Sequence, residues 1–166
     1  MPDYQLLTHE FEPVYDERSR ILILGSFPSV KSREQRFYYG HPQNRFWKVL
    51  SAVTDAPVPE TIPEKEAFLL NHGIALWDVI ARCEIIGSSD ASIRNAEPTD
   101  LRLILDHASI RRIYCNGAAA HRLFQKYQRP ICGMDAVRLP STSPANAAWS
   151  LDRLIEAWSC IREEAF

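Results

Sequence analysis

The chain has 166 residues, of which 46% are hydrophobic, and a formal net charge of −2. This length can bury one proper hydrophobic core but not two comfortable ones, so we expect residues 1–166 to form a single domain. The near-neutral charge argues against a protein that binds long stretches of nucleic acid through charge alone, but it does not exclude a local contact with phosphate.

The first twenty residues do not look like a targeting segment, because they carry several acidic side chains and no apolar run. No other stretch is apolar over the length needed to cross a membrane, so we expect a cytoplasmic protein, associated with the nucleoid if the source is bacterial. The cysteines Cys83, Cys115, Cys132 and Cys160 form no CxxC pair. They therefore indicate reduced thiols rather than a zinc site, and we expect neither a metal nor a cofactor.

Short apolar runs alternate along the chain with segments of helical periodicity. The runs expected to be strands cover residues 21–24, 74–77, 112–115 and 136–139. The segments expected to be helices cover residues 45–53, 63–71, 100–107, 118–127 and 147–164, and residues 83–98 are expected to form a long loop. Strands that alternate with helices form a parallel sheet covered on both faces. We therefore predict an α/β fold, a three-layer α/β/α sandwich with a four-stranded parallel sheet.

Polar or tightly turning segments follow every predicted strand. They are Gly25-Ser26-Phe27-Pro28-Ser29, Asp78, Asn116-Gly117 and residues 140–144. In an open parallel sheet, binding crevices lie beyond the carboxyl ends of the strands, so we place the site at that edge. In the first segment, Gly25 permits close approach of a ligand to the backbone and Pro28 stiffens the turn. Such a segment suits a pocket wall for a flat ligand, although alone it also fits an ordinary turn.

A second motif follows the first within a dozen residues. The segments GSFPS (residues 25–29) and HPQNRFWKVL (residues 41–50) together resemble the first motif region of mismatch-specific uracil and thymine DNA glycosylases, which reads GINPG followed by HPxNxFW. The later LPSTSPAN (residues 139–146) is similar to their second motif, a Pro-Ser turn that docks on DNA near the lesion. The sequences GSFPS and LPSTSPAN in particular are similar to those of the hypoxanthine-DNA glycosylase branch of the uracil-DNA glycosylase superfamily.

This resemblance implies a uracil-DNA glycosylase-like fold and an enzyme of base excision repair. Such an enzyme is a monofunctional hydrolase that flips a deaminated base out of DNA and breaks its N-glycosidic bond. The branch implies hypoxanthine, the base of deoxyinosine, as the substrate, and the alternative within the class is uracil or thymine mismatched with guanine. The expected partner is damaged DNA, double-stranded or single-stranded, and we expect a monomer.

One position departs from the family pattern and concerns the mechanism. Phe27 stands where the mismatch-specific relatives carry the asparagine that orients the attacking water, and a phenyl ring cannot hydrogen-bond a water. The hypoxanthine branch shares this loss, and resemblance to it implies that Asn44 takes over the role. An amide can hold a water without ionising, which suits hydrolysis through an oxocarbenium-like sugar. Asn44 also fits the N-cap of the following helix, and the two roles are compatible.

Tyr39 and Asp78 complete the expected base pocket. Tyr39 lies where related enzymes place an aromatic ring that stacks on the extruded base, although it also fits the apolar core. Asp78 stands where uracil-specific relatives have an asparagine that reads the base edge. An ionised carboxylate accepts hydrogen bonds, which favours a base that offers an N–H, as hypoxanthine does at N1. It also repels an anionic leaving base unless it is protonated or holds the water, and a surface acid that caps a turn is the alternative.

The remaining candidates concern anions and phosphate. Asn116-Gly117 leads into a helix whose first amides favour an anionic leaving group or a phosphate, or simply cap that helix. The hydroxyls of Ser141, Thr142 and Ser143, together with Asn146, form a polar knuckle between two prolines that suits contact with DNA. The alternative is an ordinary proline-rich turn with Asn146 as the cap of the last helix.

Two further segments are candidates for contact with DNA. Residues 87–90 (GSSD), with Ser92 and Arg94, resemble a loop of the same superfamily that lies near the lesion. Basic side chains also cluster early in the chain, although a solvated surface explains such a cluster about as well; they are Lys31, Arg33, Arg36, Arg45 and Lys48. Because Phe27 and the mild acidity are compatible with loss of activity, a non-catalytic DNA-lesion binding module is the alternative from another class.

Overall fold

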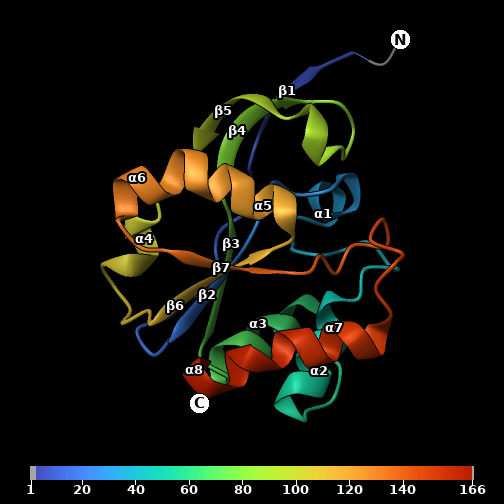
Figure 1. The fold of residues 1–166 in the computed structure, drawn as a ribbon, viewed down its shortest axis with the longest axis vertical. Helices are drawn as coiled ribbons and strands as arrows, with labels where there is room; N and C mark the ends of the chain where they lie inside the picture. Colours follow the sequence, from blue (N-terminus) through green and yellow to red (C-terminus); the bar gives the residue numbers. More distant parts are fainter. Residues whose placement is uncertain (1–2, 166) are drawn as a thin grey trace.

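The centre of the fold is a four-stranded parallel sheet whose strands lie where the apolar runs predict them. The computed structural model describes residues 3–165. The strands are β2 (Ile21–Gly25), β3 (Ile74–Asp78), β6 (Arg112–Asn116) and β7 (Ala136–Leu139). They run side by side in the order β3-β2-β6-β7 (Figure 1). Every residue of β2 is buried, as expected for a strand that is covered on both faces.

Helices cover both faces of this sheet, which confirms the predicted three-layer α/β/α sandwich (Figure 1). One face carries α2 (Phe46–Thr54), α3 (Ile62–Asn71) and α7 (Leu151–Trp158). The other carries α4 (Arg102–Leu105), α5 (Ala118–Leu123) and α6 (Arg129–Cys132). A short α1 (Val30–Gln35) follows β2, and η3 (Ser159–Ile161) and α8 (Arg162–Ala165) follow α7.

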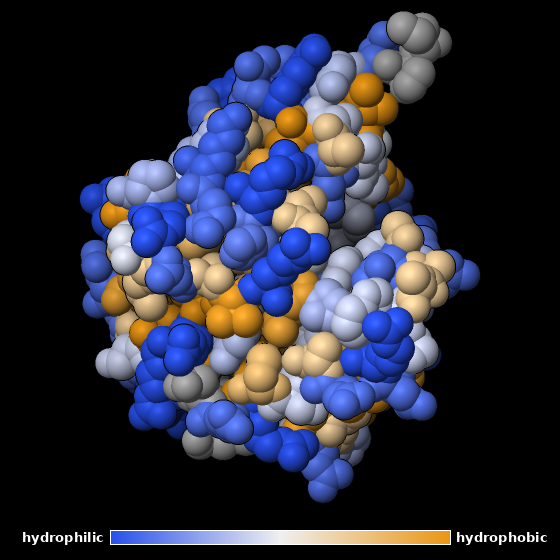
Figure 2. All heavy atoms as spheres, in the orientation of Figure 1, coloured by the Kyte–Doolittle hydropathy of each residue, from blue (hydrophilic) through white to orange (hydrophobic). Residues whose placement is uncertain are grey.

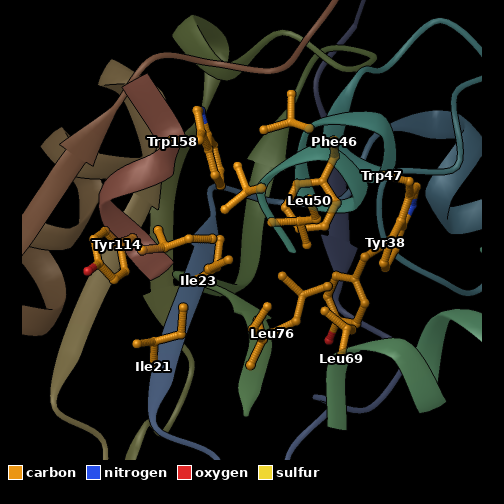
Figure 3. Packing of buried hydrophobic residues seen from close by; sticks show 14 of the residues in the cluster. Ile21, Ile23, Tyr38, Phe46, Trp47, Leu50, Leu69, Leu76, Tyr114 and Trp158 are labelled. Carbon is orange, nitrogen blue, oxygen red and sulfur yellow. The ribbon is translucent and has the colours of Figure 1, made fainter. Parts of the chain in front are cut away.

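Two apolar clusters hold these layers together, one on each face of the sheet. Side chains of α2, α3 and α7 pack against Ile21 and Ile23, as Figure 3 shows, and side chains of α4 and α5 pack against Leu22 and Leu24. The alternation within β2 follows from the two-residue period of a strand. Trp158 is fully buried in the first cluster, and its Nε1 donates to the Pro140 carbonyl oxygen at 2.9 Å. This bond fastens α7 to the loop that follows β7.

The prediction of a long loop over residues 83–98 is wrong, because the chain forms a second, antiparallel sheet there. The sheet consists of β1 (Gln5–Thr8), β4 (Ile80–Ile85) and β5 (Arg94–Pro98) in the order β1-β4-β5, with a 3₁₀ turn η1 (Asp90–Ser92) between β4 and β5. β4 begins directly after β3 and pairs with β1, which lies far away in the sequence. Local composition does not reveal such a pairing.

The helix expected over residues 118–127 is longer and irregular. After α5 the chain makes a π-helical turn, η2 (Phe124–Gln128), and then continues as α6 in spite of Pro130, which occupies the first turn of α6, where proline is tolerated. The π turn places the buried Gln128 side chain beside β5 and the β3–β4 junction. Its Nε2 donates to the carbonyl oxygens of Thr99, at 2.8 Å, and Val79, at 3.0 Å. Polar backbone groups at that junction are thereby satisfied.

The N-terminal segment crosses from the small sheet to the edge of the large one. Val14 exchanges two backbone hydrogen bonds of 2.9 Å with Leu76 of β3 and is buried in the first apolar cluster. His9, between β1 and Val14, is thereby brought to the end of β3. No helix within residues 3–165 is long and apolar enough to cross a membrane.

Candidate active site

A cavity of ≈ 310 Å³ opens at the carboxyl edge of the parallel sheet. Gly25 pairs with Asp78 across β2 and β3, and Asn116 pairs with Leu139 across β6 and β7, so the strands end level with one another. Most of the predicted candidates line this cavity: Gly25, Ser26, Phe27, Pro28, Tyr39, Asn44, Asp78, Asn116, Ser141, Thr142 and Ser143. Asn146 lies instead in an adjoining outer groove, which shares Ser141 and Ser143 with the cavity. The segments that follow the strands therefore meet at one edge, as the sequence predicts.

A chain of hydrogen bonds determines which atom Asn44 offers to the cavity. The Thr142 backbone N–H donates to Asn116 Oδ1 at 3.0 Å, so Asn116 Nδ2 donates to Thr142 Oγ1 at 3.0 Å. Thr142 Oγ1 then donates its single proton to Asn44 Oδ1 at 2.8 Å, and the Phe46 N–H donates to the same oxygen at 3.0 Å. Since Oδ1 already accepts two protons, the group that Asn44 has left for a ligand is the Nδ2 donor.

The expected cap role of Asn44 is displaced by one residue. The N-cap position of α2 belongs to Arg45, whose side chain makes no capping bond. Asn44 nevertheless satisfies the first N–H of the helix, that of Phe46, through its side-chain oxygen. The helix end therefore orients Asn44, and the structural and cavity-lining roles coexist.

Asp78 is a buried member of the site, and the alternative of a surface acid is wrong. Its side chain is 6% exposed, and Oδ2 lies 2.8 Å from Nε2 of His9, whose side chain is 3% exposed. The imidazole ring packs against Phe11 at a centroid distance of 4.5 Å. A Cβ at position 25 would collide with Asp78 Oδ1 and crowd the Tyr39 hydroxyl, so only glycine leaves room for this arrangement. A carboxylate taken out of water needs such a partner, because burial without one is costly.

Tyr39 and Phe27 form aromatic walls of the cavity. Tyr39 adopts a left-handed backbone conformation with φ 53°, and its ring stacks on Phe46 at a centroid distance of 3.9 Å. Burial and the negative charge of Asp78 raise the pKa of Tyr39, so its phenol stays neutral. Phe27 is buried and contacts the edge of the His9 ring. Tyr39 therefore packs against the apolar core and also lines the cavity.

Arg45 fastens the two motifs to each other, a role that sequence reasoning missed. Its backbone N–H donates to the Thr142 carbonyl oxygen at 3.1 Å, and Nη2 donates to the carbonyl oxygens of Ser143, at 3.0 Å, and Asn146, at 3.2 Å. Nη1 donates to the Trp149 carbonyl oxygen as well. The guanidinium is therefore engaged within the protein, and its assignment to a phosphate-binding basic cluster is wrong.

Three other cations of that cluster also have partners within the protein, and the fifth member, Lys48, is exposed on α2. Arg36 lies 3.2 Å from Glu10, Lys31 lies 3.4 Å from Glu34, and Arg33 donates to the Gly87 carbonyl oxygen at 3.3 Å. Exposed ion pairs of this kind are weak and can exchange for other partners. Four of its five cations therefore have partners within the protein, and the cluster is not a preformed phosphate site.

The second motif divides into buried and accessible groups. Thr142 is fully buried, and its amide, hydroxyl and carbonyl groups are all bonded within the protein, so its expected contact with DNA is contradicted. Ser141 and Ser143 remain partly exposed where the cavity meets the groove. Asn146 donates to the Ser141 carbonyl oxygen at 3.0 Å and does not cap α7. That helix begins at Leu151, later than expected, and Ser150 caps it by accepting the Arg153 N–H.

Two titratable side chains of the site, His9 and Asp90, lie outside the two motifs. His9 stands in no motif, and its pairing with Asp78 joins positions far apart in the sequence. Asp90 belongs to the loop segment GSSD, and it lines both the cavity and the outer groove. Ser26 Oγ donates to Asp90 Oδ1 at 2.6 Å. Among residues 3–165 no cluster of three or more His, Cys, Asp or Glu side chains is arranged to hold a metal ion.

Comparisons with known proteins agree with this architecture. Residues 12–162 match the family described as the uracil DNA glycosylase superfamily. The chain is 33% identical over 160 residues to a protein of Methanosarcina acetivorans named hypoxanthine DNA glycosylase, covering 94% of this chain and 98% of the relative. It is 33% identical over 109 residues to a protein of the same name from Methanosarcina barkeri, covering 64% and 69% of the two chains.

A solved structure shows the same fold. The solution NMR structure of a Methanosarcina acetivorans protein, described as a candidate uracil DNA glycosylase, matches with a TM-score of 0.79 at 31% identity, over 94% of this chain and 97% of that one. The matches and the cavity together define the class, a DNA glycosylase. The chain belongs to the uracil DNA glycosylase superfamily.

Proposed function

We propose that the protein removes hypoxanthine from DNA by hydrolysing the N-glycosidic bond of a deoxyinosine nucleotide that has been flipped into the cavity. The observation that carries the choice of base is the buried Asp78 carboxylate, which His9 holds in a cavity lined by aromatic rings. A fixed acceptor at that place recognises a base with an N–H on its edge, as hypoxanthine has at N1. The two relatives named hypoxanthine DNA glycosylase support the same choice.

His9 removes the objection that a carboxylate would repel the departing base. A hydrogen bond of 2.8 Å from the imidazole offsets part of the negative charge on Asp78 Oδ2. The other oxygen, Oδ1, lies beside Gly25 and Tyr39. We assign Oδ1 to the base edge and the Tyr39 ring to stacking on the flipped base, since neighbouring Phe46 already supports that ring from behind.

Asn44 is assigned to the attacking water. Its Nδ2 is the donor left over by the bonds that Phe46 and Thr142 make to its oxygen, and it lines the cavity together with Asn116. Donation from Nδ2 to the water oxygen fixes the position of the water beneath the sugar. Asn116 acts through Thr142, because its amide sets the direction of the hydroxyl that orients Asn44.

Damaged duplex DNA approaches along the outer groove in this proposal, and the protein acts as a monomer. Ser141 and Ser143 stand where the groove meets the cavity. Each hydroxyl accepts a backbone N–H and keeps its own proton to donate, so both are placed for phosphates beside the flipped nucleotide. Hydrophilic residues cover most of the face seen in Figure 2, around a small group of hydrophobic residues near its centre. Large exposed apolar side chains within residues 3–165 are scattered over different elements, including Leu6 of β1, Leu103 of α4 and Ile131 of α6. This scatter supports the monomer, because an interface needs a contiguous patch.

A panel of oligonucleotides tests the proposed function. Duplexes and single strands that carry one hypoxanthine, uracil, xanthine or guanine-mismatched thymine are incubated with excess protein, and abasic sites are then cleaved with alkali. We expect cleavage at hypoxanthine to be fastest, with release of the free base and no strand break before alkali.

Other results have definite meanings. Faster release of uracil or mismatched thymine would replace hypoxanthine with the mismatch substrates. Lesion-selective binding in a gel shift without release of any base would indicate a binding module and refute the enzyme. Release from the free nucleoside at the same rate would refute the need for DNA.

A further inference from the structure

The site lacks an obvious acceptor for the proton that the attacking water must lose. Asn44 Oδ1 already accepts two hydrogen bonds, and its Nδ2 can only donate. Asn116 also spends its oxygen on the Thr142 amide. Phe27, at the position of the family's water-orienting asparagine, carries no polar atom. His41 also lines the cavity, but its Nδ1 accepts the Gln43 N–H at 3.1 Å, so Nε2 carries the proton of the neutral ring. The remaining acceptors are carboxylates, and two of them line the cavity, Asp78 and Asp90.

Asp90 stands at the place that the sugar must occupy. It lines both the cavity and the outer groove, together with Ser141 and Ser143. A flipped nucleotide has its base in the enclosed cavity and its phosphates in the open groove, so its sugar lies where the two spaces meet. Asp78, in contrast, lines the cavity but not the groove, and it lies beside Gly25 and Tyr39.

One oxygen of Asp90 is fixed and the other is available. Ser26 Oγ donates to Oδ1 at 2.6 Å, a short bond of the kind made to a charged acceptor. No group among residues 3–165 donates a hydrogen bond to Oδ2. Ser26 thus orients the carboxylate while leaving one oxygen for a ligand or a water.

We propose that Asp90 is a further catalytic residue, the general base that takes the proton from the attacking water. The water oxygen bonds to C1′ of the deoxyribose, and the C1′–N9 bond breaks with its electron pair on the base. One water proton passes to Asp90 Oδ2 and from there to the released base, so the carboxylate is regenerated and hypoxanthine leaves neutral. The same negative charge stabilises the oxocarbenium-like sugar at the transition state. This inference rests on the proposed glycosylase function.

The charged groups around Asp90 come from several elements. Burial raises the pKa of Asp90, the Ser26 hydrogen bond lowers it, Asp78 of β3 raises it and Arg122 of α5 lowers it. The charge of Asp90 in turn raises the pKa of the Tyr39 phenol and of the Cys83 thiol of β4, and both groups are neutral. A base with a raised pKa is a stronger proton acceptor, and it remains ionised only above that raised value. Single-turnover excision should therefore decline as pH falls, at a pH above the range of an exposed aspartate.

The test compares Asp90→Asn with the wild-type protein and with Asp55→Asn. Asp55 is exposed at the end of α2 and in a left-handed conformation that asparagine tolerates, so it matches the change in charge away from the cavity. Single-turnover release of hypoxanthine is measured across pH, with lesion-DNA affinity and thermal unfolding as controls. For Asp90→Asn we expect a rate about 10²- to 10⁴-fold lower and loss of the acidic decline, with affinity unchanged or tighter. Asp55→Asn should match the wild type.

A second variant separates catalysis from structure. Ser26→Ala removes the hydrogen bond that lowers the pKa of Asp90, so the acidic decline should move to higher pH while the rate recovers at alkaline pH. A folded Asp90→Asn protein that keeps both the rate and the acidic decline would overturn the role of Asp90 and leave the glycosylase function standing. A wild-type protein that releases no base from any lesion would overturn both.

Discussion

At the scale of single residues, the direction of one hydrogen bond decides how Asn44 works. Its oxygen is occupied by the Phe46 amide and the Thr142 hydroxyl, so its contribution to a ligand is the Nδ2 donor. Replacement by alanine removes that donor, and we expect single-turnover excision to fall by about 10²-fold or more, with little change in lesion-DNA affinity. Quenched-flow or manual time courses with excess protein measure the rate directly.

A second change at position 44 tests whether the site needs a hydrogen-bond donor or an acceptor there. Asn44→Asp keeps an oxygen for Phe46 and Thr142 and replaces the donor by an acceptor, so we expect it to be as slow as Asn44→Ala. High activity of Asn44→Asp would show that the position needs an acceptor and not a donor. Asn71→Ala, at the exposed end of α3, is the matched control and should be fully active.

Residue-scale prediction from the sequence succeeded where a residue lies at the end of a strand. Gly25, Asp78 and Asn116 meet because parallel strands in register place their carboxyl ends side by side. His9 could not be placed in this way, because it reaches the site through a segment that pairs with the edge of β3. Spacing alone also could not show that Thr142 is buried inside the site.

At the scale of elements, the parallel sheet was predictable and the small antiparallel sheet was not. The parallel strands are continuous buried apolar runs, which the sequence displays directly. β5 is largely exposed, and its sequence is Arg-Asn-Ala-Glu-Pro. Because it contains no β-branched or aromatic residue, its composition does not indicate a strand. It exists because β4 offers it a partner, and β4 in turn depends on β1. The small sheet carries the turn η1, and with it Asp90, to the cavity.

The hydrogen bonds that join Arg45 to residues 143–149, here called the Arg45 clamp, give a prediction about how elements are held together. Arg45→Met keeps the aliphatic stem but removes the bonds to the carbonyl oxygens of Ser143, Asn146 and Trp149. We expect the free energy of unfolding to fall by about 2–3 kcal/mol, because partly buried carbonyl groups lose a charged donor. Denaturant unfolding measures this change, and hydrogen exchange should show faster opening of residues 141–149.

The control for the clamp is an arginine with only local bonds. Arg102 is exposed on α4 and pairs with Asp100 at 2.9 Å, so Arg102→Met should leave both measurements nearly unchanged. Equal stability of the Arg45→Met and wild-type proteins would mean that water replaces the guanidinium at no cost. The clamp would then not be what holds the second motif in place.

At the scale of the whole molecule, charge constrains how the protein can bind DNA. The net charge is −2, and three cations near the first motif, Lys31, Arg36 and Arg45, are engaged within the protein. Arg138, exposed on β7, is a cation that lines the outer groove. The neutral hydroxyls of the second motif, which remain as phosphate ligands, release no counterions. Association with DNA should therefore depend only weakly on salt.

We expect a plot of log affinity against log salt concentration to have a slope between about −1 and −3, since each phosphate neutralised by a cation contributes about −0.9. Fluorescence anisotropy with duplexes of different sequence measures this slope. Arg138→Ala should make it shallower by about one and weaken binding equally for all sequences. Arg18→Ala, at the opposite edge of the sheet before β2 and paired with Asp16, should leave it unchanged. A slope steeper than about −5 would mean that the cations between Lys31 and Lys48 bind phosphate as well, and DNA would then approach over α1 and not along the outer groove.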